Sequence, residues 1–204
     1  INTKINIPIK GKKIDLIQMV EKNINYSLDK QISKTSKNKE LEIGLREALN
    51  LKNIPRRIEV YDNSHLSGTQ PTGAMVVYRN NEFSRENYRK FNIKVESQTT
   101  NDDYLMMNQV IKRRLEISRN KLSWKNELPD LIIIDGGKGH LNLVRKIINE
   151  KKIKHIDVIS IAKGKLRNAG DETIFHLDYS LKFEKNDKIL FFLQRLRDEA
   201  HRFA

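Results

Sequence analysis

The sequence predicts an α/β fold in which helices flank a mixed sheet, and two strand patterns carry this prediction. Residues 131–134 are four apolar residues, three of them β-branched, which is typical of a strand buried on both faces. Asp135 ends this strand, and a glycine-rich turn leads into an amphipathic helix over residues 141–148. A second strand is predicted from alternating side chains, since Ile58, Val60 and Asp62 are every second residue and therefore share one face of the strand.

The composition limits the partners and the chemistry. The 204 residues include 39 Lys or Arg against 26 Asp or Glu, a net charge of +13 that favours nucleic acid first and an anionic membrane surface second. With no cysteine, a metal would need carboxylate and histidine ligands, which suit Mg²⁺ or Mn²⁺. No apolar run approaches the roughly 20 residues of a membrane span, and no signal-peptide pattern opens the chain. We expect a cytoplasmic protein without a membrane partner.

Residues 1–57 are expected to form a basic helical lead-in that packs on, or leads to, a domain over residues 58–204. The lead-in carries 13 Lys or Arg against 6 Asp or Glu. Its apolar residues recur at helical spacing over 14–28 and again over 41–49. The stretch between them, residues 33–39, has no apolar face and is either solvated helix or loop. Because the chain begins with Ile rather than Met, we expect a piece of a longer protein.

Three antiparallel strands are expected to open the domain, over residues 58–62, 72–79 and 83–95. Asp62 lies at the far end of the first of them, on the face that buries Ile58 and Val60. An ionised carboxylate in such a place is costly unless it is paired or binds a metal. Asp62 is therefore a candidate functional residue.

A helix is expected over residues 102–115, after a run of capping residues. Asp103, Met107, Ile111 and Leu115 are spaced by four, which predicts that they share the inward face. Acids in a first turn also suit the helix dipole, and this is the structural explanation of Asp103. Its place on the inward stripe favours a functional explanation.

The last third of the chain predicts one more buried strand, over residues 156–162, followed by a short hairpin whose clearest strand is 172–177. A closing amphipathic helix is expected over residues 189–203. His201 lies beside Ala200 at the edge of the apolar stripe of that helix. By itself, a histidine there is usually packed or solvated.

Three strands, a helix, a strand, a helix and a strand, with an aspartate on the first and fourth strands, is the order of a ribonuclease H-like fold. That fold places the first and fourth strands side by side, so Asp62 and Asp135 would converge. Two carboxylates so close repel each other unless a divalent cation lies between them, and such an ion can polarise a phosphodiester. The order therefore predicts a metal-dependent nuclease or a transposase-like enzyme.

Five short motifs follow one another along the chain: Tyr61-Asp62-Asn63-Ser64-His65, Asn101-Asp102-Asp103-Tyr104, Ile134-Asp135-Gly136-Gly137-Lys138-Gly139, Ala162-Lys163-Gly164 and Arg197-Asp198-Glu199-Ala200-His201-Arg202-Phe203-Ala204. In this order they resemble the C-terminal nuclease half of UvrC, the dual endonuclease of bacterial nucleotide excision repair. The resemblance implies a ribonuclease H-like endonuclease domain that cuts DNA on the 5′ side of a lesion after UvrB has been loaded, with UvrA acting upstream. The implied partners are thus DNA and UvrB.

The same resemblance assigns the site. It implies a catalytic triad of Asp62, Asp135 and His201, which would also hold Mg²⁺ or Mn²⁺. It matches Asp103 to a further acidic catalytic position. Lys138 and Lys163 would bind the substrate by offsetting phosphate charge. Two other histidines near the aspartates, His65 and His140, are interpreted as structural or DNA-facing.

Two alternatives remain open at this point. A module that only docks nucleic acid or protein could retain the fold without catalysis, although every residue of the implied triad is present. A small-molecule α/β enzyme is disfavoured by the net charge of +13. The Gly136–Gly139 stretch lacks the spacing and the Ser or Thr of a phosphate-binding NTPase loop, so no bound ATP is expected.

Overall fold

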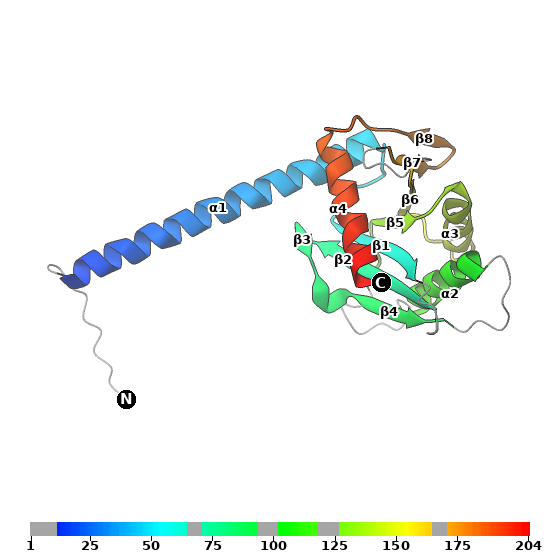
Figure 1. Ribbon diagram of the computed structural model, residues 1–204, viewed down its shortest axis with the longest axis horizontal. Helices are drawn as coiled ribbons and strands as arrows, with labels where there is room; N and C mark the ends of the chain where they lie inside the picture. Colours follow the sequence, from blue (N-terminus) through cyan, green and yellow to red (C-terminus); the bar gives the residue numbers. More distant parts are fainter. Residues whose placement is uncertain (1–11, 65–70, 94–101, 118–126, 165–170) are drawn as a thin grey trace. The chain divides into compact units, whose positions relative to one another are not determined.

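The computed structural model describes residues 12–64, 71–93, 102–117, 127–164 and 171–204. The chain divides into two compact units, residues 1–40 and residues 41–204. In the described part, eight strands form one sheet in the order β3-β2-β1-β5-β6-β7-β8, with β4 pairing beside β2 (Figure 1). This is the mixed α/β sheet that the sequence predicts.

The lead-in is one helix, α1 (Lys12–Ala48), so residues 33–39 are helical rather than a loop. Within the first unit, its apolar side chains Leu16, Met19 and Tyr26 are exposed. The end of the helix belongs to the second unit, where Leu45 and the following Leu49 are fully buried in a hydrophobic core.

The opening strands are antiparallel, as predicted: β1 (Arg57–Ser64) pairs with β2 (Thr72–Arg79). The third antiparallel strand expected over residues 83–95 is present but broken in two. The stretch contains β3 (Glu82–Phe83), the 3₁₀ turn η1 (Arg85–Asn87) and β4 (Arg89–Asn92), and both strands pair antiparallel with β2. The buried Asn87 explains the break, because its amide donates to Ser84 Oγ at 2.8 Å and so stabilises the turn.

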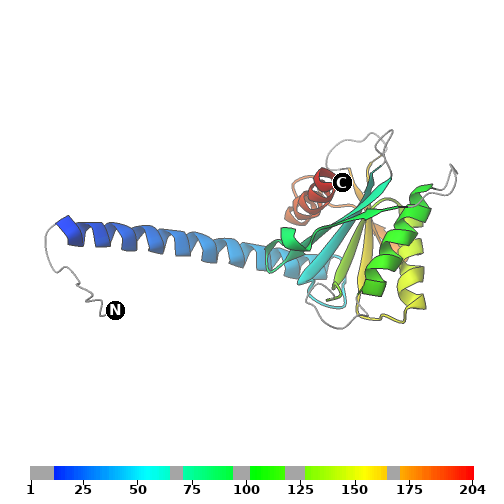
Figure 2. The same cartoon turned by 90° about the horizontal axis from the view of Figure 1, so that it is seen from below.

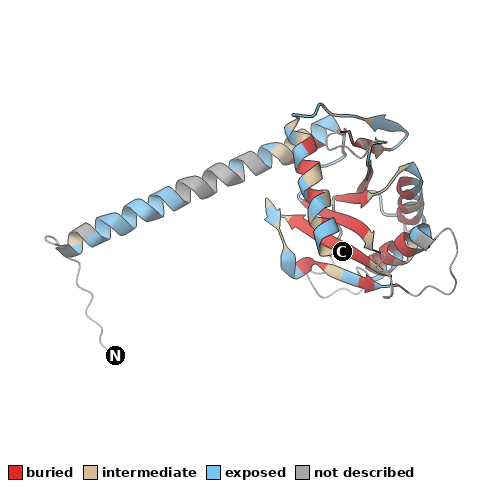
Figure 3. Ribbon diagram, in the orientation of Figure 1, coloured by how far each residue is buried: buried red, intermediate tan, exposed pale blue. Residues whose placement is uncertain are grey.

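The centre of the sheet is parallel. Strand β5 (Leu131–Asp135) lies between β1 and β6 (Asp157–Ala162) and runs parallel to both. Residues 131–134 are all buried, as their apolar run predicts (Figure 3). The predicted hairpin is present as β7 (Thr173–His176) and β8 (Tyr179–Leu181), which extend the sheet antiparallel.

Helices cover both faces of the sheet. Helix α4 (Lys188–Phe203) packs on one face, and α2 (Asp102–Ile117) and α3 (Lys138–Glu150) pack on the other (Figure 2). Alternate residues of β1 serve the two sides: Ile58 and Val60 join the core under α4, and Tyr61 joins the core under α2 and α3. Among the described residues, no helix combines the length and the apolar character that a membrane span requires.

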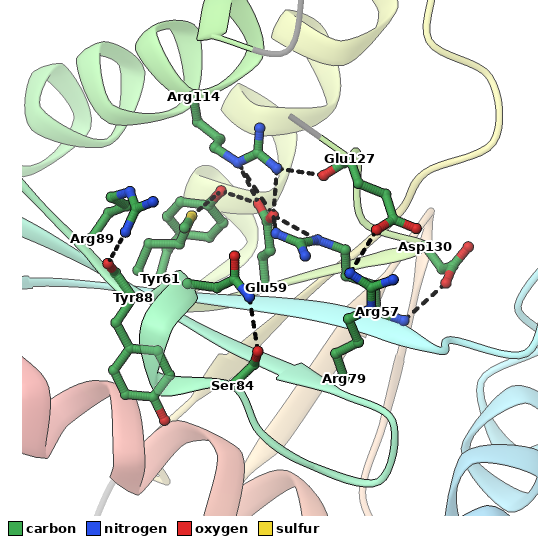
Figure 4. Close-up of polar contacts among 12 residues, drawn as sticks. Arg57, Glu59, Tyr61, Arg79, Ser84, Tyr88, Arg89, Arg114, Glu127 and Asp130 are labelled. Atoms are coloured by element: carbon green, nitrogen blue, oxygen red, sulfur yellow. Dashed lines mark hydrogen bonds and ion pairs between the residues drawn. The ribbon is translucent and has the colours of Figure 1, made fainter. Parts of the chain in front are cut away.

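A buried charge cluster lies under α2, around Glu59 of β1 (Figure 4). Its fully buried carboxylate accepts hydrogen bonds from Arg57 Nη2 at 2.9 Å, Arg114 Nη2 at 2.6 Å and Tyr61 Oη at 2.7 Å. Burial, with the negative charge of Glu59, raises the pKa of Tyr61 well above its ordinary value, so this hydroxyl stays a donor. Two arginines of the chain thus neutralise the buried charge of Glu59.

Candidate active site

The parallel pairing of β1 with β5 brings the two candidate aspartates to one edge of the sheet. Tyr61 is paired with Ile134, so Asp62 and Asp135 follow at the same level. Because Val60 and Ile133 both point into the core under α4, the next alternate residues, the two aspartates, point to the α4 side as well. The predicted convergence is therefore present in the structure.

Asp62 is a buried carboxyl group with one close partner. It is 8% exposed, and its Oδ2 lies 3.0 Å from Nδ1 of His201, which is 139 residues further along the chain. Burial raises the pKa of the Asp62 carboxyl above its ordinary value; the His201 hydrogen bond opposes this rise and the negative charge of Asp135 reinforces it. An ionised Asp62 would therefore be stabilised by a further positive charge.

Asp135 faces a lysine from the neighbouring strand end. Its side chain is 13% exposed, and Oδ2 lies 3.4 Å from Nζ of Lys163, directly after β6. Two contacts tie the turn after Asp135 to β6: the Gly136 amide donates to Ile161 O at 3.0 Å, and Ser160 Oγ donates to Gly137 O at 3.2 Å. The turn holds Asp135 and Lys163 on adjacent parallel strands.

Helix α4 carries His201 and is anchored one turn earlier. Arg197 Nη1 lies 3.0 Å from the buried carboxylate of Glu172, just before β7, and Gln194 donates to the same carboxylate at 3.1 Å. At the other end, Asp187 caps the helix by accepting from the Ile189 amide at 2.6 Å. His201 itself is 72% exposed, so its imidazole can be reached from solvent while Nδ1 stays on Asp62.

Asp103 does not lie on the inward stripe that its spacing predicts. Met107, Ile111 and Leu115 are buried, but the Asp103 side chain is 51% exposed. The reason is its place in the first turn of α2, which extends past the core to the edge of the sheet. There the Asp103 carboxylate accepts from Asn63 Nδ2 at 2.8 Å and lies 2.9 Å from His140 Nε2.

The remaining candidates divide into described and undescribed residues. Lys138 begins α3 and is exposed, and the Lys163 side chain is 51% exposed, so both ammonium groups face solvent at this edge. His140 is buried and stacks on Tyr104. His65 lies outside the described residues, so its interpretation stays a prediction.

Two observations bear on whether the residues at this edge suit a divalent cation. Asp135 lies close enough for its negative charge to raise the pKa of Asp62, and the groups beside the two aspartates are the His201 imidazole and the Lys163 ammonium. Two carboxylates and one imidazole are also a donor set that Mn²⁺ and Mg²⁺ accept. Among the described residues, no three His, Asp or Glu side chains are grouped so that they could hold a metal ion by themselves.

Comparison with family models adds a decisive match. Residues 46–204 match the model described as the UvrC RNase H endonuclease domain. The chain belongs to this family. The match confirms both the resemblance to UvrC and the ribonuclease H-like fold that the order of elements predicts.

Curated UvrC relatives align with nearly the whole chain. The UvrABC system protein C of Bradyrhizobium diazoefficiens is 41% identical over 210 residues, covering 98% of this chain and 31% of the relative. That of Sphingopyxis alaskensis is 40% identical over 205 residues, with coverages of 98% and 32%. The chain therefore spans about a third of the length of these relatives.

Solved structures give a more distant similarity. Endonuclease V of Ciona intestinalis, crystallised with a 24mer DNA containing an inosine followed by a ribo-adenosine, is 15% identical with a TM-score of 0.43, over 84% of this chain and 69% of that protein. Human ENDOV is 11% identical with a TM-score of 0.40, over 66% and 61% of the two chains.

Sequence reasoning missed the residues that connect the candidates. Asn63 occurs in a quoted motif, but nothing in the sequence indicates that its amide reaches the first turn of α2. Tyr104 and His140 form a ring stack across two helices, and Arg197 meets Glu172 across 25 residues. Arg197 could have been suspected, because it is a charged residue one turn before His201 on a partly apolar helix.

Proposed function

We propose that this chain is a Mg²⁺- or Mn²⁺-dependent DNA endonuclease domain that makes the 5′ incision beside a lesion in bacterial nucleotide excision repair. The observation that carries the proposal is the meeting of Asp62, Asp135 and His201 at one sheet edge, in a chain of the UvrC RNase H endonuclease domain family. DNA as substrate is supported by the net charge of +13. UvrB as partner, with UvrA upstream, is supported by the name of the relatives, UvrABC system protein C.

The side chains have distinct roles in this proposal. Asp62 and Asp135, with His201 at the open side, would hold the ion. The bound ion would supply Lewis-acid polarisation of the phosphodiester and stabilise the leaving oxygen. His201 would either complete the shell of the ion or handle a proton, and Nε2 is the nitrogen open to either role, because Nδ1 lies 3.0 Å from Asp62 Oδ2 and the side chain is 72% exposed.

The neighbouring cations would orient the DNA backbone. Lys163 lies within 3.4 Å of Asp135 and is half-exposed, so its ammonium could move to a phosphate oxygen once Asp135 has another cationic partner. Lys138, at the start of α3, offers a second exposed charge at the same edge. Asp103 is a further catalytic candidate because of the family resemblance. Its carboxylate lies at this edge, between Asn63 and His140.

The test is incision in a reconstituted assay with UvrA, UvrB and the full-length protein that contains this chain. Asp62→Asn and Asp135→Asn should each lower the 5′ cutting rate by about 10³-fold or more, because several kcal/mol of charge stabilisation are lost. The 3′ cut should be unchanged. Asp178→Asn is the matched control, because it makes the same change at an aspartate whose side chain is 97% exposed.

Normal 5′ cutting by either variant would end the triad proposal. Retained DNA or UvrB binding with no metal-dependent cutting by the unmodified protein would instead favour the docking module.

A further inference from the structure

Two aromatic rings form a flat stack on the side of the catalytic edge that α2 and α3 cover. Tyr104, in the first turn of α2, and His140, in the first turn of α3, have ring centroids 4.3 Å apart and ring planes within 8° of parallel. Tyr104 is 42% exposed, whereas His140 is 8% exposed. One ring of the stack is therefore presented to solvent and the other supports it from below.

The supporting ring lies beside polar groups that begin next to Asp62. Asn63 follows Asp62 in β1, and its amide donates to Asp103 Oδ1 at 2.8 Å. The other oxygen of Asp103 lies 2.9 Å from His140 Nε2. The described residues give His140 Nε2 no hydrogen bond, so the stack on Tyr104 and the nearby Asp103 charge are what surround the ring on this side.

Two glycines leave the space that the stack occupies. A Cβ at Gly139 would lie 2.4 Å from the Tyr104 hydroxyl oxygen, and a Cβ at Gly136 would lie 2.8 Å from His140 Nδ1. Neither ring could keep its position beside a larger residue. The turn after Asp135 is therefore shaped around the stack as well as around the aspartate.

On the side of the sheet that α2 and α3 cover, the stack is connected to the residues that follow the two candidate aspartates. Asp62 and Asp135 point toward α4, so the next residue of β1, Asn63, points the other way and reaches Asp103. Gly136, which follows Asp135, leaves room for the His140 ring. A DNA strand that places a phosphate at the aspartates and continues over the sheet edge would bring a neighbouring nucleotide to Tyr104. The exposed ammonium of Lys138 lies in the same turn.

We propose that Tyr104, supported by His140, is a stacking platform for an unpaired nucleobase next to the phosphate that is cut. An exposed ring with a basic side chain nearby is the arrangement by which proteins bind single-stranded nucleic acid without reading its sequence. The platform deepens the proposed nuclease function and rests on it. It implies that the strand is unpaired beside the cut, because a base within a duplex already stacks on its neighbours.

The test uses DNA oligonucleotides that carry the fluorescent base 2-aminopurine at single positions on either side of the 5′ cut. They are titrated at low salt, without divalent ions, against the full-length protein loaded with UvrB. The unmodified protein should change the fluorescence at one or two adjacent positions. Tyr104→Ala should abolish that change and weaken binding of an unpaired strand by roughly 5- to 100-fold, the usual effect of losing one stacked base.

Two variants separate stacking from general damage to α2. Tyr104→Phe keeps the ring and should keep both signals. Leu105→Ala removes the next side chain of α2, which is 54% exposed and lies outside the stack, and should behave as the unmodified protein. Thermal melting of each variant checks that the fold is retained.

Equal fluorescence and affinity for Tyr104→Ala and the unmodified protein would overturn the platform, as would the absence of any position-specific change. Neither result would change the nuclease proposal, which is tested separately by the 5′ cutting of Asp62→Asn and of Asp135→Asn. Loss of both signals in Leu105→Ala would also overturn the platform, because the effect would then belong to the helix rather than to the ring.

Discussion

Two buried carboxylates on strand β1, three residues apart, have opposite surroundings. Glu59 lies mid-strand under α2, where two arginines and a tyrosine hydroxyl contact its carboxylate. Asp62 lies at the strand end under α4, where one imidazole contacts it and a second aspartate opposes it. The chain neutralises the first charge with two guanidinium groups, whereas the second has one imidazole as its close partner. This difference is the reason why we propose a structural role for Glu59 and a metal-binding role for Asp62.

The largest effect is expected at Glu59, and its absence would contradict this comparison. Glu59→Gln should lower the free energy of unfolding by about 3–5 kcal/mol, because two buried guanidinium groups lose their counter-charge. Urea unfolding of the 204-residue chain measures this loss. At temperatures where the variant is folded, metal-dependent cutting should continue. A variant as stable as the unmodified chain would show that the buried cluster contributes little to folding.

A medium effect is expected from metal at Asp62. Mn²⁺ at 100 times its dissociation constant should stabilise the unmodified chain by about 2.7 kcal/mol, since the ion binds only the folded state. Thermal melting should therefore rise by about 5–10 °C. Asp62→Asn should lose most of this rise, whereas Glu59→Gln should keep it from a lower starting point. Equal shifts in the unmodified chain and Asp62→Asn would place the ion elsewhere.

The smallest effect is a pH dependence of stability without metal. The pKa of Asp62 is raised in the folded state, whereas an unfolded aspartate titrates near 3.9. As pH rises above that value, the folded state retains its proton longer, so the free energy of unfolding should fall through the folded pKa. Asp62→Asn should remove this fall, and at neutral pH without metal it should be the more stable protein. Urea unfolding of both proteins between pH 4 and pH 8 measures the difference. If the two profiles run parallel, the Asp62 surroundings do not favour the protonated form.

The sequence predicted the features that depend on the alternation of side chains along a strand and on the position where a strand ends. The face of Asp62, the strand before Asp135 and the last helix with His201 all follow from local patterns, which is why their convergence could be expected. The Glu59 cluster could not, because Arg114 comes from a helix 55 residues away. The exposure of Asp103 was also missed, since periodicity gives the face of a helix and not how far its first turn extends beyond the core.

The sequence pattern does not predict all of the candidate residues equally well. Asp62, Asp135 and His201 meet because of strand pairing that the fold class implies. The Tyr104 stack instead depends on two glycines and on an asparagine from a third element, Asn63. Such contacts join side chains far apart in the chain, and only the packed structure brings them into view.

The parallel pairing of β1 with β5 has a consequence for when the chain can act. The first contact between these strands joins residues 73 positions apart, and His201 reaches Asp62 across 139 residues. Such distant pairings form late, because a long loop must close before they can stabilise anything. A nascent or partly folded copy therefore holds its aspartates and histidine apart.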